Sequence, residues 1–282
     1  EEEGMVFLRL YNVETKELTR RLVINYTKVL GFDFAPNGRE VVVSAISKGQ
    51  TDLFVFNVPA NTSRRLTNDP ADDIDPVYIE NGKEILFASN RRSDTLSQGQ
   101  PVTTRVASSF DLFKIPGRGN TKVLKRVTAT PYDNEYSPVE IRKQIYTFLS
   151  DKNGIVNRHI ARYDSTISYV DTVVHYRYFT SRYALSNYDR NIEGYTVAPA
   201  KLNQGHLFYA DEEYQLYFSP LNTRRSAMKG DFRPTEFYKW RKQYIRRQDS
   251  TPPGKPTERE KILQRLSEID TANIPRPPKY VH

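Results

Sequence analysis

Four histidines are the residues of this 282-residue chain best suited to metal or acid–base chemistry, and they lie far apart at His159, His175, His206 and His282. None has a partner at the spacing of a known metal motif. The chain has no cysteine, which excludes disulfides, thiolate zinc sites and cysteine nucleophiles. A serine nucleophile elbow, a P-loop and a dinucleotide-binding loop are also absent from the sequence. We therefore predict no catalytic residue, no metal ion and no cofactor, although residues scattered through the fold could still form an active site.

An acidic cluster follows Asn68, and its carboxylates are the most concentrated oxygen ligands in the chain. Its members are Asp69, Asp72, Asp73 and Asp75. Calcium binds such oxygens, but the alternating Asp-x-Asp-x-Asp-Gly order and the distal glutamate of a calcium loop are missing. Aspartates of this kind often accept hydrogen bonds from turn amides. We predict that Asp72, Asp73 and Asp75 are structural turn residues, and calcium remains the alternative.

The positive charge of the chain lies in its last 61 residues. Residues 222–282 hold 15 lysines and arginines against 7 acids, so they account for the whole net charge of +8. A neutral body with a basic tail differs from a uniformly basic protein. Nucleic acid is therefore a disfavoured partner, although a basic arm with aromatic rings could stack bases and neutralise phosphates.

A helix is predicted over residues 231–247, with Pro234 in its first turn. Phe237, Trp240 and Tyr244 fall on one face. Either this stripe docks on the body and the cations face water, or the helix binds an acidic partner or anionic head groups. The candidate partner-binding residues are Arg224, Arg225, Phe237, Lys239, Trp240, Arg241, Lys242, Tyr244, Arg246 and Arg247.

The rest of the basic segment contains a proline-type linker at 251–256 and a second short helix. The run from Thr257 to Glu260 fits a capping box at the start of that helix. Its apolar face is short, which is typical of a helix that docks on another surface. We therefore interpret residues 222–282 as a basic arm and residues 1–221 as the body.

Two turns position the body's repeated elements. Asn37-Gly38 and Asn81-Gly82 lie 44 residues apart, and Asn-Gly is the strongest short hairpin signal. Strands are predicted at 29–34, 39–46, 52–58 and 62–67, and again at 75–79, 83–89, 109–115 and 121–128. A period of this length with several strands per unit is typical of propeller blades. The fold class is therefore an all-β propeller of four-stranded blades with a C-terminal helical and extended arm.

Further units follow on both sides of these two. A third unit begins at 136–138, and its outer part, residues 169–178, is predicted as one long alternating strand. A weaker fourth unit covers 191–221, and strands at 6–10 and 17–23 resemble the outer half of an earlier blade. Residues 91–108 interrupt the second unit as a polar insertion, either a solvated loop or a recognition loop.

These units resemble the repeats of TolB-type β-propellers, in which a Pro-aromatic-Ser-Pro-Asp-Gly stretch precedes a strand ending in serine. The likeness is best at 29–67 and 73–90 and fair at 135–163. Ile79-Glu80 departs from the family's Ser-Pro, and the third unit lacks the glycine turn. Residues 144–180 are also similar to large outer-membrane-associated proteins that carry such a propeller.

The resemblance implies a periplasmic protein of the Gram-negative envelope. We expect a non-enzymatic scaffold for protein–protein interaction in outer-membrane assembly, transport or integrity, with outer-membrane proteins or lipoproteins as partners. The alternative is a propeller enzyme or carbohydrate-binding module with its site on the ring axis. No apolar run is long enough for a spanning helix.

The number of units is smaller than a closed TolB-type ring requires. The chain starts at Glu1 without an initiator methionine, which suggests a processed or excised end. We expect either that missing blades come earlier in a longer protein, which the abrupt start favours, or that both termini complete one blade of a small ring.

Overall fold

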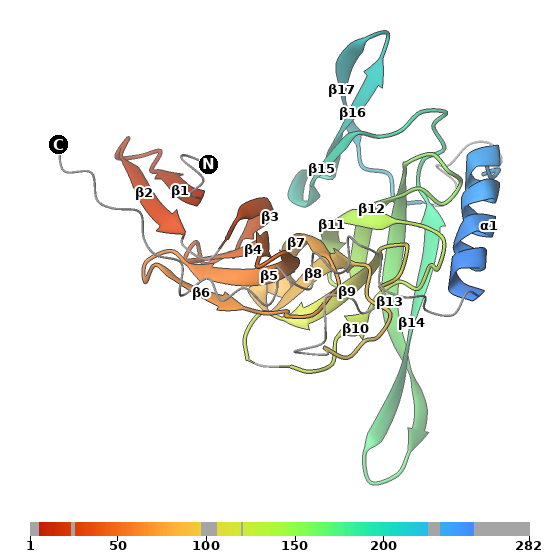
Figure 1. Ribbon diagram of the computed structural model, residues 1–282, viewed down its shortest axis with the longest axis horizontal. Helices are drawn as coiled ribbons and strands as arrows, with labels where there is room; N and C mark the ends of the chain where they lie inside the picture. Colours follow the sequence, from red (N-terminus) through yellow and green to blue (C-terminus); the bar gives the residue numbers. More distant parts are fainter. Residues whose placement is uncertain (1–5, 24–25, 97–105, 120, 225–231, 251–282) are drawn as a thin grey trace.

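The computed structural model describes residues 6–23, 26–96, 106–119, 121–224 and 232–250 (Figure 1). They form five antiparallel sheets and one helix. The first sheet contains β1 (Val6–Tyr11) and β2 (Leu18–Val23). Blade 1 contains β3 (Lys28–Phe34), β4 (Glu40–Ser47), β5 (Gln50–Asn57) and β6 (Thr62–Arg65). Blade 2 contains β7 (Asp73–Ile79), the 3-10 turn η1 (Glu80–Gly82), β8 (Glu84–Ser89), β9 (Asp111–Pro116) and β10 (Lys125–Arg126).

The chain continues into two more blades and a helix. Blade 3 contains β11 (Glu135–Arg142), β12 (Ile145–Ser150), β13 (Asn157–Val170) and β14 (Val174–Ala184). Blade 4 contains β15 (Gly194–Ala198), the 3-10 turn η2 (Pro199–Lys201), β16 (Asn203–Ala210) and β17 (Glu213–Pro220). Helix α1 spans Glu236–Ser250. Each of the eight strands predicted for the first two units has a counterpart in the structure.

The first strands of the blades lie next to one another. Within each blade the strands pair in chain order. Strand β3 contacts β7, β7 contacts β11, and β11 contacts β15. Blades that meet along their first strands are radially arranged, which is the arrangement of a propeller. The structure thus confirms the all-β propeller predicted from the 44-residue repeat.

The two Asn-Gly turns connect the first two strands of blades 1 and 2. Gly38 has φ +65°, Asn81 +57° and Gly82 +82°. Asparagine and glycine tolerate this left-handed region best, which is why the turns use them. The side-chain oxygen of Asn37 also accepts a hydrogen bond from the Arg39 amide at 2.8 Å.

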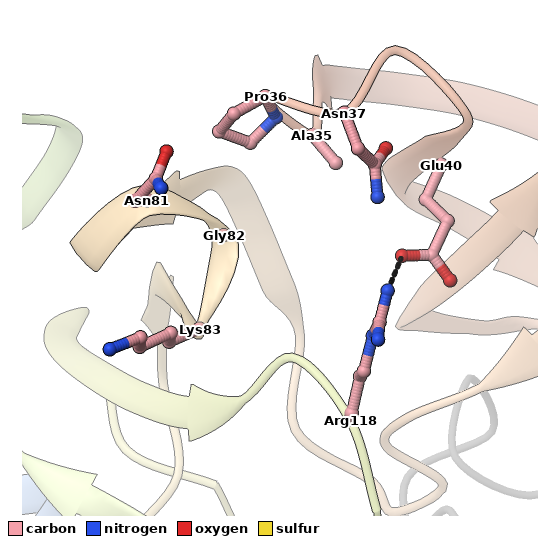
Figure 2. Close-up of a pocket in the computed structure, with 8 residues that line it drawn as sticks. All are labelled: Ala35, Pro36, Asn37, Glu40, Asn81, Gly82, Lys83 and Arg118. Carbon is pink, nitrogen blue, oxygen red and sulfur yellow. Dashed lines mark ion pairs between the residues drawn. The ribbon is translucent and has the colours of Figure 1, made fainter.

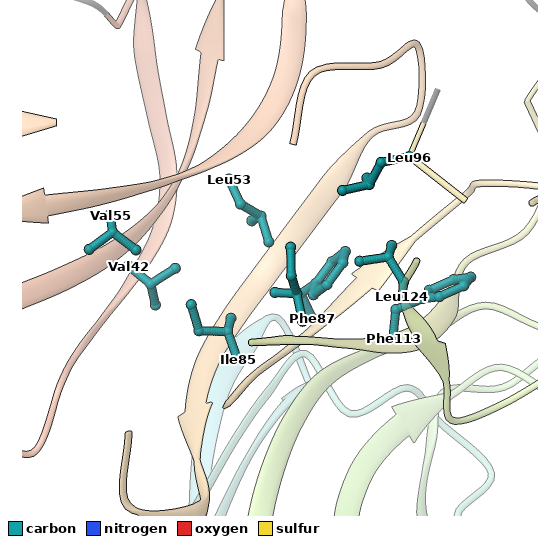
Figure 3. Packing of buried hydrophobic residues seen from close by; sticks show 9 residues of the cluster. Val42, Leu53, Val55, Ile85, Phe87, Leu96, Phe113 and Leu124 are labelled. Carbon is teal, nitrogen blue, oxygen red and sulfur yellow. The ribbon is translucent and has the colours of Figure 1, made fainter. Parts of the chain in front are cut away.

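The core consists of apolar layers between neighbouring blades. Figure 3 shows the layer between blades 1 and 2, where Val42 and Val55 face Ile85 and Phe87. The next residues along these strands face the other way, so Leu86 packs towards blade 3. Both faces of the central strands are therefore buried, and this explains their uninterrupted apolar runs. The largest hydrophobic side chains in this layer include Phe87 and Phe113, both fully buried.

The single long strand predicted at 169–178 is wrong. The chain instead turns at 171–173, and β13 pairs with β14 in a hairpin that projects from the blade (Figure 1). Asp171 favours the turn because its carboxylate accepts a hydrogen bond from the Val173 amide at 2.9 Å. Tyr169 and His175 become cross-strand neighbours, with their rings stacked 4.1 Å apart.

Helix α1 begins at Glu236, five residues later than predicted. Pro234 precedes it, and Thr235 is the cap, since its hydroxyl oxygen accepts a hydrogen bond from the Tyr238 amide at 3.2 Å. The predicted second helix lies within 251–282, outside the described residues. No helix in the part of the chain that the structure describes is long and apolar enough to cross a membrane.

Candidate functional site

Helix α1 is fixed to blade 3 at its first turn. The Thr235 amide and hydroxyl each donate a hydrogen bond to the Asn153 carbonyl at 2.8 Å. Gly154 lies directly beneath, where a Cβ atom would come within 2.0 Å of the Thr235 hydroxyl oxygen. Gly154 also has φ +91°, so both the backbone conformation and the close approach require glycine here. The loop between β12 and β13 is thus shaped to receive the helix.

One face of α1 docks on the loops of blade 3. Tyr238 donates a hydrogen bond from its hydroxyl to the Asp133 carboxylate at 2.6 Å. Burial and this carboxylate raise the pKa of Tyr238, so the hydroxyl keeps its proton. One turn further, Arg241 Nη2 donates to Asp151 Oδ1 at 2.9 Å and to the Tyr132 carbonyl at 2.8 Å. Ile245 completes the docked face and is buried.

The predicted aromatic stripe of α1 faces solvent. Phe237, Trp240 and Tyr244 are 56%, 58% and 49% exposed. Trp240 and Tyr244 stack with 5.4 Å between their ring centroids, and Phe237 lies tilted against Trp240 at 6.0 Å. The expectation that this stripe docks on the body is therefore wrong. Polar contacts determine the orientation of α1 instead. Because Arg241 binds Asp151 of blade 3, the aromatic face of the helix points to solvent.

The predicted cations of the arm differ in their surroundings. Lys239 is exposed and pairs with Glu236 at 2.5 Å, within the helix. Lys242 lies over the Tyr132 ring, with its amino nitrogen 5.2 Å from the centroid, and Arg246 donates to the Tyr132 hydroxyl at 3.1 Å. The side chains of Arg224, Arg246 and Arg247 are exposed, and Arg225 lies outside the described residues. Arg241 therefore binds blade 3 of the same chain, although we predicted from the sequence that it contacts a partner.

The acidic cluster at 69–75 surrounds a buried arginine. Arg91 Nη1 lies 2.9 Å from Asp69 Oδ2, and Arg91 Nη2 lies 2.7 Å from Asp73 Oδ1. Burial opposes the charge of Arg91, but the two aspartates raise its pKa above the ordinary value. The cluster therefore neutralises a cation of the chain itself, between blades 1 and 2.

The other aspartates of the cluster bind different groups. Asp72 accepts a hydrogen bond from the Asn90 side-chain amide at 3.1 Å. Asp75 accepts from the amide of Ser137 at 2.8 Å and from its hydroxyl at 3.1 Å. Among the described residues, no group of three or more histidine, aspartate or glutamate side chains could hold a metal ion.

Acids on the first strands link neighbouring blades. Asp33 accepts a hydrogen bond from the Tyr78 amide at 2.8 Å, across the boundary between blades 1 and 2. Glu140 accepts from the Glu80 amide, also at 2.8 Å, across the next boundary. Together with Asp75, these carboxylates satisfy backbone donors of an adjacent blade. They hold the blades in register near the axis.

A surface cavity of about 390 Å³ lies where the Asn-Gly turns of blades 1 and 2 meet (Figure 2). Asn37 and Asn81 line it, and Gly82 approaches Pro36 so closely that a Cβ would lie 3.2 Å from its ring. Arg118 crosses one side and pairs with Glu40 at 3.6 Å. Arg118 is exposed, so this pair is weak.

Sequence reasoning missed a polar cluster between blades 3 and 4. Arg158 is buried, and its Nη1 lies 3.0 Å from His206 Nε2. Burial, helped by the Arg158 charge, lowers the pKa of His206 to about 4, so the imidazole is neutral. The two residues are 48 positions apart and belong to different units. No local motif in the sequence signals their contact.

Comparisons with known proteins agree with this fold. No family model matches the chain. The chain is 36% identical over 59 residues to the Tol-Pal system protein TolB of Helicobacter hepaticus, covering 21% of this chain and 14% of that protein. It is 28% identical over 80 residues to dipeptidyl-peptidase 5 of Porphyromonas endodontalis, covering 26% of this chain and 12% of that protein. These matches span only a small part of the two relatives.

A solved structure extends the likeness over more of the chain. TolB from Acinetobacter baumannii superimposes with a TM-score of 0.52 at 12% identity, covering 77% of this chain and 47% of that one. The chain therefore has a TolB-like β-propeller fold.

Proposed function

We propose that this chain is a non-enzymatic scaffold for protein–protein interaction, with helix α1 as its contact surface. The observation that carries the proposal is the orientation of α1. Its polar face is used for docking on blade 3, and three aromatic rings are left exposed on the opposite side. Tryptophan, tyrosine and arginine are the residues that contribute most to protein interfaces. A rigidly mounted aromatic stripe also loses little conformational freedom on binding.

The charge around the stripe indicates the chemistry of the partner. Lys239 and Arg247 are exposed on α1, and residues 222–282 carry the whole net charge of the chain. An apolar groove with an acidic rim complements such a surface, because opposite charge guides encounter and orientation. We therefore infer a partner protein of this kind. Residues 222–282 would act as the interaction arm and residues 1–221 as the platform.

The cellular setting of the proposal is the periplasm, in association with the outer membrane. The support is the TolB-like fold, together with the matched segment of a Tol-Pal system protein. Under this proposal the partners are outer-membrane proteins or lipoproteins. Their complexes would serve assembly, transport or integrity of the envelope.

The test is purification of the tagged chain from its own cell envelope after light crosslinking. The double variant Phe237→Ala and Trp240→Ala removes two rings that are more than half exposed, so the fold should persist. Tyr214→Ala is the matched control, because Tyr214 is an exposed aromatic on β17. We expect specific outer-membrane proteins with the wild type and the control, and their loss with the double variant. Equal recovery from all three chains would refute the role of α1.

The second candidate is an enzyme or carbohydrate-binding module with its site on the ring axis. The match to dipeptidyl-peptidase 5 favours it. The acids found on the first strands, however, accept backbone hydrogen bonds from neighbouring blades. Incubation with dipeptide nitroanilides and a panel of envelope sugars would test it. Turnover or saturable binding that Asp33→Asn removes, with folding retained, would favour this function over the scaffold.

A further inference from the structure

Arg158 is a buried cation whose neighbours in the structure are neutral. It lies on β13, between blades 3 and 4, and is only 4% exposed. Its Nη1 contacts the side-chain oxygen of Gln204 and His206 Nε2. Its Nε is buried and, within the described part of the chain, has no hydrogen-bond partner. One edge of the guanidinium is therefore unsatisfied.

No carboxylate of the described residues pairs with Arg158. The nearby hydroxyls of Tyr195 and Tyr188 are uncharged at neutral pH and do not balance it. Burial lowers the pKa of Arg158, yet a guanidinium remains protonated at neutral pH. His206 adds no counter-charge, because its imidazole is neutral and accepts a hydrogen bond from Arg158.

Five other buried or half-buried arginines meet an acid, whereas the half-buried Arg64 donates to the backbone carbonyls of Gly117 and Gly119. The pairs are Arg65 with Asp52, Arg91 with Asp69 and Asp73, Arg126 with Asp111, Arg182 with Glu135, and Arg241 with Asp151. An unpaired charge in a protein interior is strongly unfavourable, which explains this regularity. Arg158 departs from it while being as deeply buried as Arg91.

We propose that Arg158 binds a carboxylate supplied from outside this chain. A carboxylate fits the planar edge of a guanidinium and would satisfy Nε. One cation balances one carboxylate, whereas a phosphate monoester carries nearly two negative charges at neutral pH and would remain uncompensated. The carboxylate belongs either to a free organic acid or to an acidic side chain of a partner protein.

Tyr188 is more exposed than Tyr195, so a carboxylate would have to reach Arg158 past Tyr188. Tyr188 is 40% exposed, and its ring packs edge-on against His206 with centroids 6.1 Å apart. Tyr195 stacks on His206 at 5.7 Å and is held by a hydrogen bond to the Thr147 hydroxyl at 2.6 Å. The bound group would thus have a cation at its carboxylate end and aromatic rings beside its body.

Thermal unfolding in sodium acetate and sodium chloride, at equal ionic strength and pH 7, tests the proposal. We expect acetate to raise the wild-type midpoint in a saturable manner relative to chloride. Arg158→Met should abolish this difference, and Arg158→Lys should retain part of it. Arg190→Met is the control, because Arg190 is exposed and pairs with Asp189 at the surface. No acetate-specific rise in the wild type, or an equal rise in Arg158→Met, would overturn the proposal.

Purification from the native envelope distinguishes the two sources of the carboxylate. A small organic acid released on denaturation from the wild type, but absent from Arg158→Met, identifies a free ligand. A crosslinked protein lost from Arg158→Met, but retained with Arg190→Met, identifies an acidic side chain. If neither is found and the crosslinked proteins are identical, the proposal is wrong.

Discussion

Two arginines, Arg91 and Arg158, are buried between neighbouring blades in opposite electrostatic settings. Arg91, between blades 1 and 2, contacts Asp69 and Asp73. Arg158, between blades 3 and 4, contacts neutral groups. Asp69 comes from the loop that joins the two blades. The corresponding loop before blade 4 carries Asp189, which is exposed and pairs with Arg190. The comparison teaches that the connecting loop and the start of the following strand together decide whether a buried arginine at a blade interface meets an acid, since Asp69 lies in the loop and Asp73 is the first residue of β7.

The largest expected effect is the loss of Arg91. Arg91→Met leaves Asp69 and Asp73 buried without their cation, so we expect a loss of about 3–5 kcal/mol in the free energy of unfolding. Arg158→Met removes a cation that has no carboxylate, and we expect a change within about 1 kcal/mol, of either sign. Urea unfolding of both variants measures the contrast. Similar losses would show that the two interfaces do not differ in this way.

The next effect concerns the contact between helix α1 and blade 3, in which Arg241 of the helix pairs with Asp151 in the loop between β12 and β13. Arg241→Met leaves Asp151 half-buried without this partner, and we expect a loss of about 1.5–3 kcal/mol. The released helix should also be cut faster by trypsin. Lys239→Met is the control, because the exposed pair with Glu236 contributes at most about 0.5 kcal/mol. Unchanged cleavage in Arg241→Met would mean that α1 is held by other contacts.

A smaller effect is the pH dependence of folding stability that Asp52 gives to the interface of blades 1 and 2. Burial, opposed by Arg65 and helped by Asp73, raises the pKa of Asp52 to about 7. The unfolded value is about 3.9, so the folded state binds the proton more tightly. The stability from this group is present below about pH 4 and is lost as the pH rises towards 7. Asp52→Asn should remove this decline, as measured by urea unfolding between pH 4.5 and 7.5.

The interface of blades 3 and 4 should show the opposite pH dependence. The pKa of His206 is lowered to about 4 by burial, from an ordinary value of 6.5. Its contribution to stability is therefore present above pH 6.5 and is lost as the pH falls towards 4. His206→Gln should reduce this loss over the same pH range. If both variants shifted the pH profile in the same direction, one of the two assignments would be wrong.

The repeat allowed much of the fold to be predicted. Gly38, Asn81 and Gly82 adopt a backbone conformation that few residues tolerate, so the spacing of the two Asn-Gly pairs defines hairpins in two blades. The hairpin of β13 and β14 was missed because alternating residues on both sides of Asp171 gave no sign of a turn. A turn capped by one aspartate has a weaker signature than Asn-Gly.

The candidate site was predicted only in part, because two faces of α1 have the same periodicity. Phe237, Trp240 and Tyr244 have the spacing of a buried stripe, but so do Tyr238, Arg241 and Ile245. The choice depends on Gly154 and Asp151, which lie more than 80 residues earlier in the chain. Long-range contacts of this kind leave no local pattern, and the same holds for Arg158 and His206.

Strand β13 has a consequence for local dynamics. Residues 157–161 are buried within blade 3, whereas residues 164–170 are exposed in the projecting hairpin. Both halves are hydrogen-bonded to β14, but only the first also pairs with β12. A single strand should therefore show two rates of amide hydrogen exchange. The buried half would exchange only when the blade opens, while the projecting half would exchange by fraying from the tip.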